Sequence, residues 1–342
     1  MKKIEFIVKR LTDMNYKAML KTVSDIHKKT GKNRFFMLCD VVYCGFKYGA
    51  GYSDYKYFEF YTLNAQQRKT YIVRATNNVI AAHCNKKEFY HCLNDKVEFD
   101  EKYSEFLKRD WLDFRTAKRE AFMRFIDGKK AIIVKPVDLT CGEGVEKLTV
   151  ADFENNEAVY NKLRSMPNAQ LLEDYVEQHK KMSELYPYSV NTCRITTLLK
   201  GDDVYIMAAS LRIGNNAKVV DNLSSGGMMA PIDIKTGIVS YSACDEQDME
   251  YAVHPMTGTA IKGFEVPYWN EAVDMCKRAT KVTPEIRYSG WDVAVTENGP
   301  VFIEGNHLPG YGLIQTPPSQ QDPKVYGMLP VFREILKDEL KI

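Results

Sequence analysis

The stretch Ser-Gly-Trp-Asp-Val-Ala-Val-Thr-Glu-Asn-Gly-Pro-Val-Phe-Ile-Glu-Gly-Asn-His-Leu-Pro-Gly occupies residues 289–310 and decides the fold of this sequence. Its two apolar runs are separated by Glu-Asn-Gly at 297–299, and Pro300 opens the second run, where a missing N–H group is tolerated. The stretch is therefore predicted to form two short strands joined in a hairpin.

The apolar residues of this hairpin predict its register. Five of them have odd numbers, namely Trp291, Val293, Val295, Val301 and Ile303. One face collects all five only if the connection has three residues, with Gly299 in the left-handed conformation. This register places Asp292 directly across from Glu304, with Asn306 two residues further along the same face.

Two carboxylates that face each other repel unless a cation or a proton lies between them. Carboxylate and amide oxygens suit a hard ion such as Mg²⁺, which takes its remaining ligands from water and phosphates. The alternative is the solvent-facing side of an edge hairpin, but Gly305 and Leu-Pro-Gly at 308–310 predict a tight exit loop instead. Asp292, Glu304 and Asn306 are therefore candidate ligands of Mg²⁺, with Mn²⁺ as the alternative ion, beside the solvent-facing interpretation.

Composition narrows the function classes. The chain has 342 residues, enough for two or three subdomains, and a net charge of +2, which does not indicate binding to nucleic acid or to a membrane surface. It contains no apolar run near the roughly 20 residues of a membrane span, and its first residues lack the apolar core of a signal peptide. Eight scattered cysteines without a Cys-x-x-Cys pair indicate reduced thiols, so we expect a cytoplasmic protein.

The first 92 residues read as a mainly helical, aromatic-rich region. Helical periodicity predicts helices over 12–30, 33–48 and 65–83. The tyrosine-rich segment 52–61 lies between the second and third of these. Its rings either pack the helices together or form a wall of an acceptor pocket.

A lysine ends a buried strand in the middle of the chain. Residues 131–136 follow a predicted helix at 116–126 and read Ala-Ile-Ile-Val-Lys-Pro. A lysine in this position needs a partner, which is either a structural glutamate or a ligand phosphate. The loop 137–145 follows at once, and its Gly142 and Gly144 let backbone N–H groups approach an anion.

The sequence pattern between residues 154 and 283 predicts further strands and helices. A helix around 154–164 precedes a strand at 170–176, and strands at 192–200 and 203–213 carry Arg194 and Arg212. A hairpin turn at 233–237 and a helix at 270–283 lead back to the hairpin at 289–310.

Assembled in this order, the features between residues 93 and 312 resemble the ATP-grasp superfamily. They are the lysine-ended strand, the glycine loop and the closing Asp…Glu-x-Asn, Pro-Gly pattern. More narrowly, the sequence resembles the sugar-transfer associated ATP-grasp proteins. The resemblance implies an α+β fold in which two subdomains, 93–176 and 177–342, clamp ATP after a helical region at 1–92.

The resemblance also assigns a nucleotide site. Lys135 and the earlier Lys96 would hold phosphates, and a lid at 140–144 would fold over them. The residues implied in the lid and the adenine linker are Thr140, Gly142, Gly144, Glu173, Tyr175 and Val176. Either Glu177 or Glu184 would meet the ribose.

A reaction centre is implied beside the metal. Arg194 and Arg212 would surround the γ-phosphate and an acyl phosphate, although a surface ion pair is the alternative for each. Asn222 lies in Asp-Asn-Leu-Ser-Ser-Gly-Gly, which resembles the Asn-Leu-x-x-Gly-Gly passage of the family. His307 departs from the pattern, and the helical first region departs from the βαβ domain of many ATP-grasp enzymes, so the acceptor stays open.

The resemblance implies a carboxylate–amine ligase that forms an acyl phosphate from ATP, acting on a small-molecule substrate of surface polysaccharide or sugar metabolism. The first alternative is a kinase that phosphorylates a hydroxyl or other acceptor, with His307 or an Asp as its base. The second is a nucleotide-binding protein without catalytic activity. An intact set of metal ligands at Asp292, Glu304 and Asn306 argues against the second.

Overall fold

A computed structural model describes residues 15–137, 142–216, 221–247, 249–312, 314–315 and 326–339. The chain divides into two compact units: a helical unit, Met1–Ile80 with Gln315–Ile342, and a sheet unit, Ala81–Ile314. Gln315 and the described residues 326–339 belong to the helical unit. The boundary expected at residue 176 stays a prediction.

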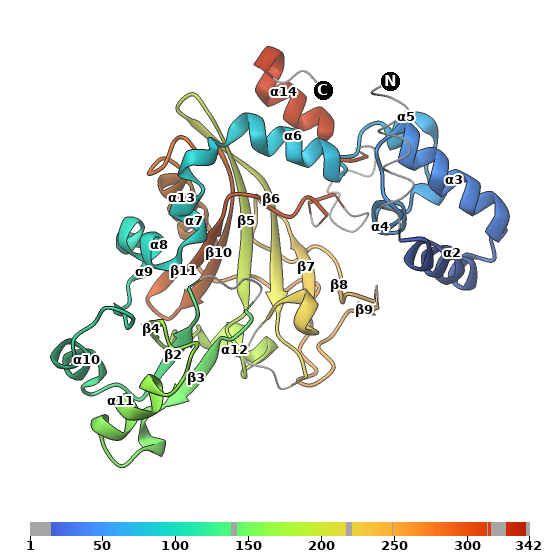
Figure 1. The fold of residues 1–342 in the computed structure, drawn as a ribbon. Coiled ribbons are helices and arrows are strands. Elements are labelled where there is room, and N and C mark those ends of the chain that lie inside the picture. Colours follow the sequence, from blue (N-terminus) through green and yellow to red (C-terminus); the bar gives the residue numbers. More distant parts are fainter. Residues whose placement is uncertain are drawn as a thin grey trace. The chain divides into compact units, whose positions relative to one another are not determined.

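The helical unit is built from short helices (Figure 1). The segments are α2 Tyr16–Thr30, α3 Arg34–Lys47, α4 Tyr52–Tyr57, η1 Phe60–Thr62, α5 Ala65–Arg68, α14 Leu329–Leu336 and η6 Lys337–Glu339, while α6 Arg74–Cys84 crosses the unit boundary. Helix α2 begins after Asn15, whose side chain accepts the N–H of Ala18, and ends at Gly31 with φ of +71°. The first two predicted helices are confirmed over their described residues; residues 12–14 lie outside them.

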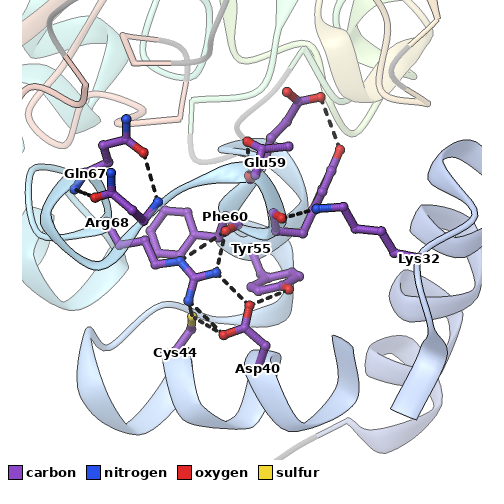
Figure 2. A network of polar contacts seen from close by, with 11 residues as sticks. Lys32, Asp40, Cys44, Tyr55, Glu59, Phe60, Gln67 and Arg68 are labelled. Atoms are coloured by element: carbon purple, nitrogen blue, oxygen red, sulfur yellow. Dashed lines mark hydrogen bonds and ion pairs between the residues drawn. The ribbon is translucent and has the colours of Figure 1, made fainter. Parts of the chain in front are cut away.

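An ion pair fastens α3 to the rest of the helical unit (Figure 2). Arg68 donates from both terminal nitrogens to the Asp40 carboxylate, each at 2.7 Å, and the Tyr55 hydroxyl donates to the same group at 2.8 Å. Tyr55, Phe58 and Phe60 are buried and in ring contact with their neighbours. For these three rings, the packing interpretation of the aromatic segment is confirmed.

The prediction of a single helix over 65–83 is wrong, because the helix is interrupted in the middle of this range. Residues 71–73 are not helical and separate α5 from α6. The Gln315 side chain accepts the Ile72 N–H at 2.9 Å and donates to the Ile72 carbonyl. A partner distant in sequence therefore occupies the backbone groups of Ile72 in this break between the helices, which local periodicity does not reveal.

A four-stranded antiparallel sheet forms one part of the sheet unit (Figure 1). Its order is β1-β4-β2-β3, with β1 Trp111–Asp113, β2 Ala131–Lys135, β3 Glu146–Thr149 and β4 Leu171–Asp174. Phe122 and Ile126 of α10 Arg119–Ile126, and Val159 of α11 Asn156–Arg164, pack on this sheet in one apolar core. The core fixes β2, and therefore its terminal Lys135.

The second sheet has seven antiparallel strands in the order β11-β10-β5-β6-β7-β8-β9 (Figure 1). The strands are β5 Thr192–Lys200, β6 Asp203–Ile213, β7 Met228–Ile232, β8 Ala243–Cys244, β9 Glu250–Tyr251, β10 Tyr288–Thr296 and β11 Gly299–Asn306. The predicted strands 192–200 and 203–213 are confirmed. Residues Ile195, Leu211, Trp291 and Val293 point into the large apolar core shared with α13 Trp269–Thr280.

Short helices complete the sheet unit. They are η2 Lys87–Phe89, α7 His91–Asn94, α8 Lys96–Lys102, α9 Ser104–Leu107, η3 Val150–Asp152, α12 Lys180–Leu185 and η4 Leu223–Ser225. Within the described residues, every helix is too short or too polar to cross a membrane.

The hairpin at 289–310 has the predicted pairing but a different connection. Asp292 lies opposite Glu304 and Gly299 has φ of +100°, both as predicted. The turn, however, contains only two residues, because Thr296 pairs with Gly299. A bulge that leaves Ile303 unpaired restores the register and brings Phe302 into the core, where its ring stacks on Trp291 at 4.9 Å.

This register predicts the cost of two truncations. Phe302→Ala removes a fully buried, stacked ring and is expected to lower the free energy of unfolding by about 3–5 kcal/mol. Ile303→Ala, at the half-buried bulge, is expected to cost less than half as much. Urea unfolding of both variants is the measurement, and a larger loss for Ile303→Ala would contradict the observed register.

Candidate functional site

One face of the seven-stranded sheet packs against the apolar core, and its opposite face carries charged residues. Asp292 pairs with Glu304 on one side and with Arg194 on the other, and Arg194 pairs with Ser210, two residues before Arg212. Side chains alternate along a strand, so these residues share the face opposite the core residues. The sequence therefore brings together residues from β5, β6, β10 and β11.

Asp292 is held between two arginines. Its carboxylate accepts from Arg194 Nε, from Arg194 Nη2 at 2.8 Å and from Arg212 Nη1 at 2.9 Å. Asp292 is 2% exposed. Burial alone would raise its pKa, but Arg194 and Arg212 hold the pKa of Asp292 well below its ordinary value. The carboxylate is therefore ionised and fully compensated.

Asn222 joins this group through Arg212. Its Oδ1 lies 3.5 Å from Arg212 Nη1. The chain turns sharply just after it, because the N–H groups of Ser225 and Gly227 both donate to the Asn222 carbonyl. A Cβ on Gly227 would lie 2.3 Å from the Asp221 carbonyl oxygen, so this turn needs glycine there.

Glu304 and Asn306 lie at the more open end of the group. The Glu304 side chain is 43% exposed, and its Oε1 lies 3.9 Å from Arg194 Nη2 and 3.4 Å from Asn306 Nδ2. Partial burial and the nearby Asp292 carboxylate raise the pKa of Glu304. Arg194 and Arg212 lower the pKa of Glu304 by less than burial and Asp292 raise it.

The donor chemistry of this group fits a hard cation. Asp292, Glu304 and Asn306 present carboxylate and amide oxygens on one face, and Glu304 is accessible. Both Asp292 oxygens are already in contact with arginine, so a cation would compete with Arg194 and Arg212 for that carboxylate.

A second charged cluster surrounds Glu173 on β4. Lys135 Nζ lies 2.7 Å from both carboxylate oxygens of Glu173, which is 3% exposed, and Arg109 Nε donates to it at 3.0 Å. Lys135 therefore has the glutamate partner that the sequence left as one of two options. The nucleotide roles of Lys135 and Glu173 stay predictions.

Lys96 lies at the same loop as Lys135. Its Nζ donates to the Pro136 carbonyl at 2.8 Å and lies 3.5 Å from the Val137 carbonyl. At the far end of this loop, Gly142 and Gly144 have φ of +74° and +71°, and the Gly144 carbonyl accepts from Asn168. Thr140 lies outside the described residues.

The residues expected to read adenine follow β4 directly. Tyr175 and Val176 are half-buried, and the Tyr175 ring lies 3.5 Å from Lys147 Nζ of β3. His307 is placed with its ring 4.0 Å from that of Tyr90, centroid to centroid, and burial lowers its pKa.

Sequence reasoning missed two residues of the second cluster. Arg109 contacts Glu173 and also donates to the Phe302 carbonyl, which ties β4 to β11 of the other sheet. Asp100 on α8 is 1% exposed, and burial together with the Glu173 carboxylate raises its pKa to about 7. The only sequence signal was an aspartate four residues after Lys96 in an otherwise amphipathic helix.

The sequence and the fold were compared with those of known proteins. The chain matches the sugar-transfer associated ATP-grasp family over residues 66–321. A search of curated proteins finds no match.

Solved structures similar to the chain include ATP-grasp ligase PsnB complexed with a minimal precursor, at 16% identity and a TM-score of 0.41 over 74% of this chain and 63% of that one. The L-amino acid ligase from Bacillus licheniformis has 12% identity and a TM-score of 0.42, over 72% and 48%. The biotin carboxylase from Campylobacter jejuni has 12% identity and a TM-score of 0.39, over 64% and 41%. The alignments thus span less than two thirds of each of these proteins.

The fold is that of an ATP-grasp protein, an α+β fold with a helical N-terminal region, as the sequence predicted. The match covers well over half of the chain, and the protein belongs to the sugar-transfer associated ATP-grasp family.

The ion pairs of Asp292 with Arg194 and Arg212 predict that neutralising this carboxylate strongly lowers the free energy of unfolding. Asp292→Asn would leave two mostly buried arginines without an anionic partner, and we expect a loss of about 3–5 kcal/mol in the free energy of unfolding. Glu304→Gln, at a half-exposed site, is expected to change it by less than about 0.5 kcal/mol. Denaturant unfolding without ligand measures both, and equal losses would contradict the described ion pairs.

The raised pKa of Asp100 predicts a pH dependence. Between its unfolded value near 4 and about pH 7, the folded protein holds a proton that the unfolded chain has released, so stability falls as pH rises, by on the order of 1 kcal/mol per pH unit. Glu173, whose pKa is lowered by Arg109 and Lys135 against the effect of burial, contributes the opposite slope only at lower pH.

Asp100→Asn is therefore expected to flatten the decline in unfolding free energy between about pH 5 and pH 7. The exposed Asp127→Asn is the matched control and should leave it unchanged. A wild-type slope in Asp100→Asn would contradict the assignment.

Proposed function

We propose that this protein is an ATP- and Mg²⁺-dependent carboxylate–amine ligase that works through an acyl phosphate. One observation carries the proposal: Arg194, Arg212 and Asn222 form a single contact network with Asp292 and Glu304 on one sheet face. A tight grouping of fixed cations suits the transfer of a phosphoryl group, because the negative charge that develops meets donors already in place. Membership of the ATP-grasp family supports it.

The nucleotide is proposed to bind beside the loop that follows Lys135. Lys96 contacts the carbonyls of this loop, so both proposed phosphate lysines lie at its beginning. The glycines at its end adopt left-handed conformations, which suit N–H groups turned toward an anion. Tyr175 and Val176 are proposed to read the base with their backbone groups, because they directly follow β4, which ends at Asp174.

The metal is proposed to be Mg²⁺, held by Asp292, Glu304 and Asn306. When bound, it would neutralise phosphate charge as the γ-phosphoryl group moves. Arg194 and Arg212 are proposed to stabilise the same charge, and Asp292 holds both of them while no cation competes for its carboxylate. A closed loop at 140–144 would keep water from the acyl phosphate.

The substrates are proposed to be a small-molecule carboxylic acid and an amine from surface polysaccharide or related sugar metabolism, which rests on the family description. The kinase alternative would need a base beside the acceptor. The candidate His307 has its ring packed against Tyr90, so no observation in the described site favours that alternative.

The first test is ligand-dependent stability. At ~100 times its dissociation constant, a non-hydrolysable ATP analogue with Mg²⁺ should raise the free energy of unfolding by roughly 2.7 kcal/mol. Glu304→Gln should lose the part of this gain that depends on Mg²⁺ and keep its stability without ligand, because the Glu304 side chain is 43% exposed and lies 3.9 Å from Arg194. The exposed Glu271→Gln is the matched control and should behave as wild type.

The outcomes separate the proposed site from the proposed reaction. No stabilisation of the wild type at saturating nucleotide would contradict the nucleotide site. A full Mg²⁺-dependent gain in Glu304→Gln would contradict the metal assignment. If nucleotide binding is observed, the products distinguish the two reactions. A ligase releases ADP and phosphate only when both an acid and an amine are present. A kinase gives a phosphorylated acceptor and no free phosphate.

A further inference from the structure

The outward face of α3 is apolar where a surface helix normally carries polar groups. We call it the α3 outer face; its members are Phe35, Phe36, Cys39, Tyr43 and Phe46. Phe35 and Phe36 are 68% and 72% exposed, and Tyr43 and Phe46 about half. Single exposed apolar residues are common, but four rings along one helix face are a contiguous patch that indicates an interaction site.

The opposite face of α3 prevents this patch from turning inward. Met37, Val41 and Cys44 are buried, and Asp40 beside them is clamped by Arg68 and Tyr55 (Figure 2). Rotating α3 would break a two-point ion pair that also holds the Phe60 carbonyl through Arg68. The contacts of the opposite face therefore fix the orientation of α3 and keep the α3 outer face exposed.

Basic residues are frequent in the segment of the chain that contains this patch. Between Asn15 and Tyr48, seven residues are Lys or Arg and two are Asp. Of the acids, Asp40 is compensated by Arg68 and Asp25 is half-buried on α2. Arg34 directly precedes Phe35, Lys47 directly follows Phe46, and Lys28 is exposed at the end of α2. None of these three basic residues forms an ion pair with another described residue.

We propose that the α3 outer face docks on an anionic membrane surface, with its rings at the headgroup level and Arg34, Lys28 and Lys47 among the lipid phosphates. Exposed aromatic residues flanked by Lys and Arg are the combination that favours the membrane–water interface. A second copy of the chain fits less well, because a two-fold contact would bring the same basic residues face to face. The proposal concerns only the helical unit and is independent of the ligase reaction.

Vesicle sedimentation tests the proposal with the full-length protein. We expect binding to phosphatidylcholine vesicles that contain about one third phosphatidylserine, and loss of binding when salt rises from about 0.05 to about 0.5 M. Phe35→Ser with Phe36→Ser should weaken binding on the order of tenfold, because two rings no longer enter the interface. Each of Lys28→Gln and Arg34→Gln should weaken it about fivefold.

Matched controls come from the sheet unit. Tyr188→Ser removes an aromatic ring that is 57% exposed, and Lys118→Gln removes an exposed charge; neither should alter vesicle binding. All variants change exposed residues, and unfolding curves check that each remains folded. Absence of wild-type binding, or unchanged binding by the double phenylalanine variant, would overturn the proposal. So would a wild-type dimer that the same double substitution converts to a monomer, because the patch would then be a subunit interface.

Discussion

The buried Asp292 carboxylate is the constraint on which the charged face depends. An ionised carboxylate that is 2% exposed is tolerated only when cations and hydrogen bonds replace the water it has lost. Those cations come from two other strands, so β5, β6 and β10 must keep the register that sets Arg194 and Arg212 around it. Gly290 helps, because a Cβ there would lie 3.2 Å from the Arg194 side chain. Strand pairing and the arrangement of the site are thus one requirement.

The second cluster repeats the same arrangement on the other sheet. Glu173 faces Lys135 and Arg109 as Asp292 faces Arg194 and Arg212, so each buried carboxylate orients two cations. Arg109 connects the two, because it also reaches the Phe302 carbonyl on β11. In both clusters the carboxylate fixes the cations in place before any anionic ligand arrives, which is what electrostatic preorganisation requires. The Glu173 partner of Lys135 is therefore compatible with the phosphate role proposed for this lysine.

Sequence reasoning succeeded where the determining interactions are local and failed where they are distant. Apolar runs located strands 192–200 and 203–213, and helical periodicity located α2, although the start predicted at residue 12 lies outside the described residues. The pairing of Asp292 with Glu304 was predicted although the turn was not, because a shorter turn and a bulge at Ile303 shift the register in opposite directions. Arg109 could not be found, since its two contacts lie 64 and 193 residues away in the chain. The break at Ile72 had the same cause, a glutamine 243 residues away.

The net charge of the whole chain also misleads, because it averages over segments of different charge. The chain carries +2 in total, yet the segment from Asn15 to Tyr48 carries an excess of five positive charges, so the remaining residues are net acidic. At physiological ionic strength a charge acts over roughly 8 Å, so a surface responds to the charges beside it and not to the sum for the chain. A near-neutral composition therefore does not exclude an anionic partner for the α3 outer face. Binding to an anionic partner depends on whether basic and aromatic side chains lie on one exposed helix, and α3 carries both.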